Sequence, residues 1–164
     1  FTYHAGLVAT HPYASRWWQW LLDLRPILYY LSYGDGTVST IGAFVNPLLC
    51  WGGLLALPVL AYRAWKRDRT ALFLLVGYLA QVLPWVFISR LTFEYHYFAA
   101  TLFLVLALGY VLDRLRRRGY LGIVYAFTAA NGVLFALFYP VLTGVTIPRD
   151  YAWNVLKWLP DWPF

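Results

Sequence analysis

Charged residues, cysteine and methionine are scarce in this chain. Only 12% of its 164 residues are charged, whereas a soluble domain carries about 25%. The single cysteine, Cys50, has no partner within the chain, so cysteines say nothing about the compartment. Methionine is absent and the chain opens on Phe1, so we expect a piece of a longer protein. A complete large enzyme is excluded by the length.

The motifs of soluble enzymes are also missing. The sequence has no glycine-rich phosphate loop, no cysteine or histidine pair at zinc spacing and no nucleophile elbow. His4 and His11 are seven residues apart, but Pro12 disfavours the helix that would bring them together. We therefore expect neither a metal site nor a cofactor. The first ten residues lack the basic start and long apolar run of a signal peptide.

Apolar residues make up most of what is present. The chain is 62% hydrophobic and 21% aromatic, and its mean hydropathy is +0.58. Four apolar runs each approach the roughly 20 residues that span a bilayer. They cover residues 43–62, 71–89, 97–112 and 121–142. The sequence predicts an all-α integral membrane fold with four transmembrane helices.

Basic residues gather in two connectors between these runs. They are Arg63, Lys66, Arg67, Arg69, Arg114, Arg116, Arg117 and Arg118. Short basic loops stay in the cytoplasm, which puts 63–70 and 113–120 inside and both chain ends outside. We interpret the clusters as topology signals that also touch anionic lipid headgroups, and not as a nucleic-acid site. The predicted domains are an outer segment, 1–42, a four-helix domain, 43–142, and an outer tail, 143–164.

The segment before the first run is rich in tryptophan and tyrosine, which favour the membrane interface. Over residues 12–33 we expect a short interfacial helix on the outer face, capped near Ser15 and ended before Pro26. Residues 33–37 are typical of a turn. Asn46-Pro47 indicates the start of the first span, because proline is tolerated in a first helical turn.

A polar segment lies between the second and third runs. Within eight residues it holds the ionisable Arg90, Glu94 and His96 and the phenols of Tyr95 and Tyr97. Polar groups are costly beside hydrocarbon, so this segment is a candidate functional site. Arginine offers a fork of donors that suits phosphate, and histidine can exchange a proton. Alternatively, a helical segment would let Arg90 and Glu94 pair with each other, and the tyrosines would belong to an interfacial belt.

Two separated motifs carry a family resemblance. The first is His11-Pro12-Tyr13-Ala14-Ser15-Arg16-Trp17-Trp18-Gln19-Trp20, followed by Leu24-Arg25-Pro26 and Tyr29-Tyr30. The second comprises Arg90, Phe93, Tyr95, His96 and Tyr97. Their order, with four spans after the first, resembles the C-terminal four-helix membrane region of protein O-mannosyltransferases, especially the bacterial ones. The resemblance covers nearly the whole chain.

The resemblance implies a C-type glycosyltransferase of the bacterial plasma membrane. Such an enzyme takes mannose from polyprenyl or dolichyl phosphate and transfers it to Ser or Thr of exported proteins. In the family the catalytic carboxylate lies in an external loop near the N-terminus. No acid of this chain matches that loop, so we expect no catalytic residue here and no activity without the remaining N-terminal part.

For this chain the resemblance suggests two groups of site residues. Arg90 and His96, with Arg25, are expected to hold the donor phosphate, while the spans hold the isoprenoid tail. The acceptor or lipid entrance would be formed by His11, Tyr13, Trp17, Tyr95 and Tyr97, while the favoured alternative for the aromatic run around Tyr13 and Trp17 is a membrane anchor. Two alternatives stay open: a non-catalytic scaffold or assembly module, and a related transferase that moves another sugar. A transporter is disfavoured because the charges lie at the ends of the spans.

Overall fold

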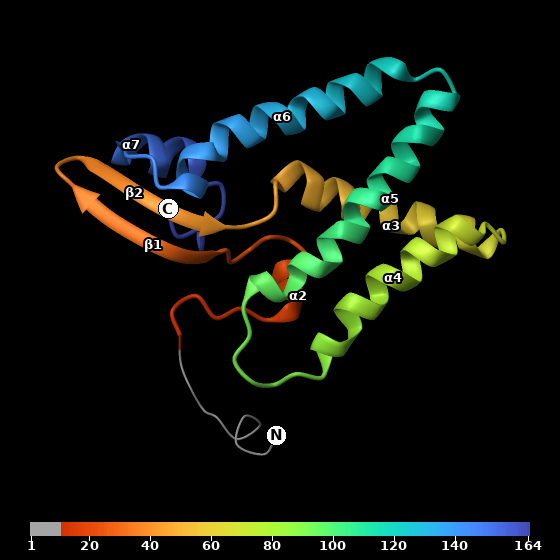
Figure 1. The fold of residues 1–164 in the computed structure, drawn as a ribbon, viewed down its shortest axis with the longest axis horizontal. Helices are drawn as coiled ribbons and strands as arrows, with labels where there is room; N and C mark the ends of the chain where they lie inside the picture. Colours follow the sequence, from red (N-terminus) through yellow and green to blue (C-terminus); the bar gives the residue numbers. More distant parts are fainter. Residues whose placement is uncertain (1–10) are drawn as a thin grey trace. The chain divides into compact units, whose positions relative to one another are not determined.

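The computed structural model describes residues 11–164 (Figure 1). The chain divides into two compact units, each built from separated stretches. The first unit contains the described part of Phe1–Phe44, Phe87–His96 and Ala136–Phe164. The second contains Val45–Val86 and Tyr97–Phe135. His4 lies outside the described residues.

Long apolar helices dominate the chain. They are α3 (Pro47–Trp65), α4 (Arg69–Val86), α5 (Phe98–Arg117) and α6 (Leu121–Thr143). All four are long and apolar enough to cross a membrane, with the third candidate span beginning at Glu94. The predicted four-helix membrane fold is confirmed, and each expected run coincides with one helix.

The second unit packs α3, α4 and α5 through small side chains. Its core contains Ala56, Leu60, Ala71, Leu74, Ala107 and Leu108. Gly53 of α3 faces Leu104, and Gly77 of α4 faces the ring of Phe103. Small residues let helix backbones approach closely, which matters in lipid because apolar burial does not drive helices together there.

Helix α3 begins where the sequence predicts. The Asn46 side-chain oxygen accepts hydrogen bonds from the backbone amides of Leu48 and Leu49, at 3.1 and 3.4 Å. Pro47 occupies the first helical turn, where its missing N–H costs nothing. The Asn46 amide also donates to the carbonyl oxygen of Asn131 on α6, at 3.1 Å. One side chain therefore caps α3 and joins it to a second helix.

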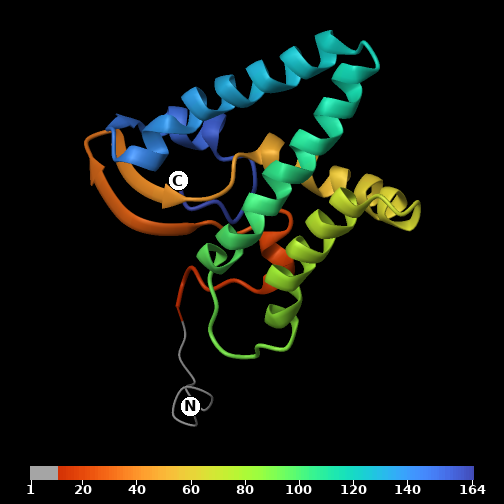
Figure 2. The ribbon, with the colours of Figure 1, turned by 45° about the vertical axis from the view of Figure 1, so that its right-hand side comes forward.

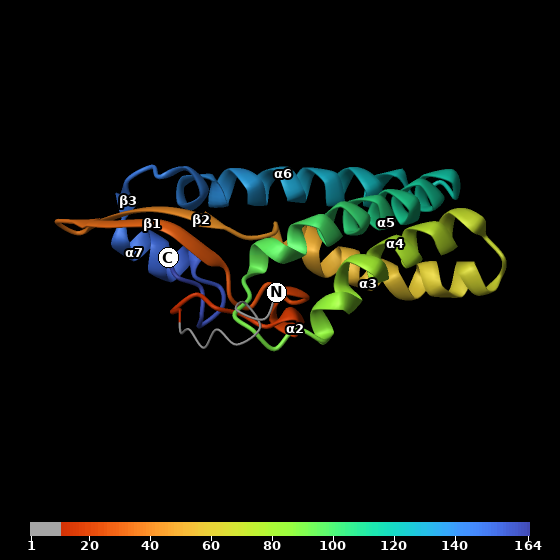
Figure 3. The same cartoon turned by 60° about the horizontal axis from the view of Figure 1, so that its bottom comes forward.

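The first unit contains an antiparallel sheet, so the expectation of an all-α fold is incomplete. Strands β1 (Ile27–Gly34) and β2 (Thr37–Ala43) form a hairpin, and the short β3 (Ile147–Pro148) pairs with β2 near its turn (Figures 1 and 3). Figure 2 shows the curvature of the hairpin. The expected turn is confirmed, with Gly36 at a φ of 65°. β-Branched and aromatic residues favour strands, and here that preference prevails over an interfacial helix.

The predicted interfacial helix is a single turn, α2 (Trp17–Trp20). Its N-cap residue is Arg16, one position after the expected Ser15. Asp23 adopts a φ of 55°, in the left-handed region that an α-helix cannot continue through. The helix therefore ends well before Pro26.

The end of the chain packs into the first unit. A short helix, α7 (Arg149–Tyr151), and a π-helical turn, η2 (Ala152–Leu156), precede it. The ring of Phe44 lies 5.1 Å from Trp162 and 5.3 Å from Phe138 and from Phe164, measured between centroids. The Trp162 indole N–H donates to the carbonyl oxygen of Asp23 at 2.7 Å. This aromatic cluster fixes the segment that follows α2.

Candidate functional site

The structure brings the two sequence motifs together within the first unit. The amide of Ser15 donates to the carbonyl oxygen of Thr92 at 2.9 Å. The Thr92 hydroxyl donates to the carbonyl oxygen of Ser15 at 2.6 Å. Both residues are buried, so water does not compete for these bonds. We call the two joined segments, residues 11–25 and 90–96, the motif junction.

Aromatic rings line the junction around His96. Trp20 stacks on the imidazole at 5.9 Å between ring centroids, and Tyr95 stacks on it at 4.4 Å. His11 meets Phe93 edge to face at 5.0 Å. Trp20 is held in place because its indole N–H donates to the Ser15 hydroxyl at 2.8 Å. Each motif therefore supplies rings to the same site.

The orientation of the His96 ring is set by its own backbone turn. Its Nδ1 lies 2.8 Å from the carbonyl oxygen of Phe93 and 3.2 Å from the Phe93 amide nitrogen. The residue belongs to the 3-10 helix η1 (Glu94–Tyr97), directly before α5. A ligand of this imidazole would therefore have to use Nε2.

Two carboxyl groups are buried in the junction. Asp23 and Glu94 are both 0% exposed and interact with each other. Arg90, in contrast, is exposed, and the chain between it and Glu94 is not α-helical. The alternative in which Arg90 and Glu94 neutralise each other across a helical turn is therefore not what the structure shows. Asp23 was not singled out in the sequence, although an acid beside a tryptophan-rich run was a usable signal.

The arginines of the predicted phosphate site differ in their surroundings. Arg25 is half-buried, and its guanidinium donates to the carbonyl oxygen of Pro12 at 2.8 Å. This bond fixes Arg25 within the first motif and uses one of its five N–H groups. Arg90 lies on the exposed bend that leads into the second motif.

The predicted entrance residues fall into two groups. His11 and Tyr95 are exposed, and Tyr13 and Trp17 are half-buried, all in the first unit. Tyr97 belongs to the second unit and is 1% exposed, with its hydroxyl 2.8 Å from that of Tyr78 on α4.

Tyr29, from the end of the first sequence motif, also approaches the junction. Partial desolvation and the neighbouring Tyr95 phenol raise the pKa of Tyr29 above its usual value. Ser15, Thr92 and Trp20 were missed as structural links, because hydrogen bonds between distant segments leave no local pattern. The described residues include no group of three or more metal-ligating side chains.

Four helices long and apolar enough to cross a membrane define a multispan membrane protein region. A family model described as the C-terminal four-transmembrane region of protein-O-mannosyltransferase matches residues 1–162. The chain belongs to this family, as the sequence motifs predicted.

Curated relatives and a solved structure agree with the family. The chain is 37% identical to a polyprenol-phosphate-mannose–protein mannosyltransferase of Mycobacterium tuberculosis, over 99% of this chain and 35% of that protein. Its counterpart in Mycolicibacterium smegmatis is 32% identical, over 99% of this chain and 36% of that protein. This chain thus spans about a third of the length of these relatives.

The fold resembles the Saccharomyces cerevisiae protein O-mannosyltransferase Pmt1-Pmt2 complex bound to the sugar donor. The TM-score is 0.81 at 23% identity, over 99% of this chain and 25% of that one. At this identity the likeness establishes the fold alone.

Proposed function

We propose that this chain is the donor-binding membrane region of a protein O-mannosyltransferase. The whole protein transfers mannose from a polyprenyl or dolichyl phosphate to Ser or Thr of exported proteins. The observation that carries the proposal is the motif junction, where the Ser15–Thr92 bonds join the segment that contains Arg25 to the segment that contains Arg90 and His96. The names of the mycobacterial relatives support the donor and the reaction.

The proposed task of the junction is to stabilise negative charge. When mannose leaves a lipid phosphate, charge develops on the phosphate oxygens, and fixed donors stabilise that charge. Arg90 is exposed and Arg25 keeps unused N–H groups, so both can bind phosphate oxygens. His96 contributes through Nε2. The exposed or half-buried rings of His11, Tyr13, Trp17 and Tyr95 then line the entrance for lipid or acceptor.

The junction does not offer a general base to the acceptor hydroxyl. Asp23 and Glu94 are fully buried, and a base must come within about 3 Å of the proton that it removes. The catalytic carboxylate is therefore supplied by the remaining N-terminal part of the same protein. The basic connectors support an arrangement in which the junction lies on the extracytoplasmic side of a bacterial plasma membrane, where exported proteins arrive. Residues 1–42, 43–142 and 143–164 act as outer segment, membrane domain and outer tail.

Transfer of radiolabelled mannose tests this proposal. The full-length protein, with polyprenyl-phosphate mannose and a Ser/Thr peptide, is compared with its Arg90→Ala and His96→Ala variants. Loss of a charge-assisted contact costs about 1.5–3 kcal/mol, so Arg90→Ala should lower kcat/KM for the donor by tens-fold. Lys157→Ala, which removes an exposed charge from the same unit, is the matched control. Unchanged donor kinetics in Arg90→Ala would show that Arg90 does not bind the donor.

A second candidate function is a scaffold that touches no substrate. It is favoured by one observation: His96 stacks on Trp20 and bonds its own backbone, as a structural histidine does. This candidate predicts that His96→Ala lowers the melting temperature while the donor KM and kcat of the folded fraction stay unchanged. The donor-binding proposal predicts instead that His96→Ala changes the donor KM or kcat of the folded fraction more than it changes the melting temperature.

A further inference from the structure

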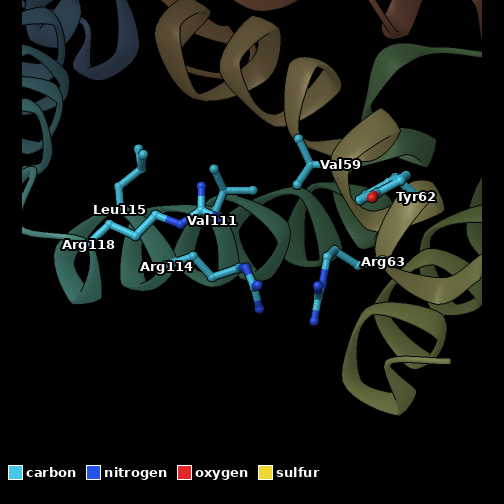
Figure 4. Close-up of a pocket in the computed structure, with 7 residues that line it drawn as sticks. All are labelled: Val59, Tyr62, Arg63, Val111, Arg114, Leu115 and Arg118. Carbon is cyan, nitrogen blue, oxygen red and sulfur yellow. The ribbon is translucent and has the colours of Figure 1, made fainter. Parts of the chain in front are cut away.

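The second unit has a pocket at its basic end, and none of its lining residues belongs to the motif junction. It has a volume of about 290 Å³ and lies between the last turns of α3 and α5 (Figure 4). Arg63, Arg114 and Arg118 supply its cationic side. Val59, Val111 and Leu115 supply its apolar side, with Tyr62 beside them. Cations and aliphatic side chains thus line one cavity.

Two of the three arginines, Arg63 and Arg114, lie beside a single carboxylate. Asp68 Oδ2 lies 3.2 Å from a guanidinium nitrogen of Arg63 and 3.9 Å from one of Arg114. The Tyr110 hydroxyl donates to the same oxygen at 2.6 Å. Hydrogen bonds from Tyr110, the Ala71 amide and Arg63 lower the pKa of Asp68 to about 2, so the carboxylate stays ionised. Figure 4 shows Arg63 and Arg114 extending their guanidinium ends to the same side.

The pocket keeps an excess of positive charge. One carboxylate serves two arginines, and the ion pairs found among residues 11–164 do not include Arg118. The two connectors carry eight basic residues against Asp68 and Asp113, so the whole formal net charge of +6 lies at this end. An anion is therefore the ligand that the pocket favours.

The position of the pocket narrows the class of anion. Arg63 lies two residues before the end of α3, and Arg114 lies in the last turn of α5. Both helices are candidate membrane spans, so their basic ends meet the lipid headgroups. Tyr62 and Trp65 are exposed there, as interfacial aromatics are, and Lys66 lies 4.8 Å from the Trp65 ring.

We propose that this pocket binds the phosphate headgroup of an anionic membrane phospholipid. The guanidinium groups of Arg63, Arg114 and Arg118 bind the phosphate oxygens, and the start of an acyl chain lies against Val111 and Leu115. The volume is close to the lower end of the roughly 300–1,000 Å³ of small-molecule sites. It therefore takes a headgroup, while the acyl chains continue along the exposed apolar surface of the spans.

Native mass spectrometry of the full-length protein tests the proposal. The protein is released from detergent in the presence of phosphatidylglycerol or phosphatidylcholine, and retained lipid is counted. We expect preferential retention of phosphatidylglycerol, weakened about tenfold or more by Arg118→Gln, since a charge-assisted contact is lost. Arg116→Gln is the matched control, because it removes the same charge from the same helix end. The native Arg116 side chain bonds Asp113 and does not line the pocket.

Four outcomes would overturn the proposal. Equal weakening by Arg118→Gln and Arg116→Gln would mean diffuse attraction and no site. Equal retention of both lipids would remove the anion preference. Displacement of the lipid by inorganic phosphate at similar concentration would mean a site for free phosphate. As a second variant, Val111→Trp fills the apolar side of the pocket without changing its charge and should also release the lipid. Unchanged lipid retention in this variant would show that the lipid does not bind in this pocket. None of these readouts depends on mannosyl transfer.

Discussion

The two units treat their polar residues in opposite ways. The first unit buries several of them: Asp23 and Glu94 are 0% exposed, and Thr40 is 1% exposed. Its described basic and acidic residues are equal in number. The second unit packs apolar helices and leaves its acids, Asp68 and Asp113, beside arginines at the helix ends. A balanced unit recognises an anion through individually placed groups, whereas an unbalanced one attracts anions by its overall field.

The largest expected effect is on the aromatic framework of the first unit. Trp20→Ala removes a 1% exposed indole that stacks on His96 and donates to Ser15. It should destabilise the protein by about 3–5 kcal/mol, as large core truncations do. Chemical denaturation in detergent measures the loss.

Trp18→Ala is the matched control, because Trp18 is 46% exposed and belongs to the same helical turn. Hydrogen exchange sharpens the comparison: Trp20→Ala should speed exchange in 11–25 and 90–96, and leave α4 protected. Equal losses in both variants would show that burial at Trp20 does not stabilise the first unit.

The next effect breaks the close packing of the second unit. A Cβ at Gly53 would lie 2.8 Å from Leu104 Cβ, which cannot swing aside because it is attached to the helix backbone. Gly53→Ala should therefore destabilise by about 1–3 kcal/mol, as overpacking does. Gly109→Ala, whose Cβ would meet nothing within 4 Å, should be neutral or stabilising by up to about 1 kcal/mol. Equal unfolding midpoints for Gly53→Ala and Gly109→Ala would show that the close packing of α3 against α5 at Gly53 does not contribute to stability.

A smaller loss is expected at the Asn46 cap, which joins two helices. Asn46→Ala removes the acceptor for Leu48 and Leu49 and the donor to Asn131. It should cost about 1 kcal/mol, the usual value of an N-cap. The exposed Asn154 provides the control, since Asn154→Ala removes a surface amide. Amide hydrogen exchange at the first turn of α3 should be faster in Asn46→Ala than in the wild type. Exchange that is no faster would count against the cap.

The smallest effect concerns pH at the basic end. The pKa of Asp68 is about 2 in the folded protein, below the usual value near 3.9. Its contribution to stability is therefore fully present above about pH 4 and is lost as the pH falls toward 2. The difference in melting temperature between the wild type and Asp68→Asn should shrink over this range. A difference that stays constant from pH 5 to pH 2 would mean that Tyr110 and Arg63 do not hold the carboxylate.

Local signals in the sequence predicted the spans well. A long apolar run specifies a membrane helix by itself, and Asn46-Pro47 specifies a helix start by its own chemistry. The sheet was missed because its strands carry exposed tyrosines, such as Tyr29 and Tyr33, that also suit a membrane interface. The pairing of Val38 with Ile147 joins distant segments, and no periodicity reports such a contact.

The sequence predicted the two motifs of the site but not that they lie together in the fold. Their residue types identified Arg90 and His96 as candidates, but the bonds between Ser15 and Thr92 span 77 residues of sequence. Spacing also paired Glu94 with Arg90 as an alternative, because it assumed an α-helix. The chain there forms a bend and a 3-10 turn, and Glu94 faces Asp23 instead.

The contact between Gly77 and Phe103 has an evolutionary consequence. The phenyl ring occupies the space that any side chain at position 77 would need, so the two positions share one volume. Enlarging position 77 requires either that the Phe103 ring rotates away or that position 103 becomes smaller. Related sequences should therefore combine a small residue at one position with a large one at the other, and the pair should be inherited as a unit.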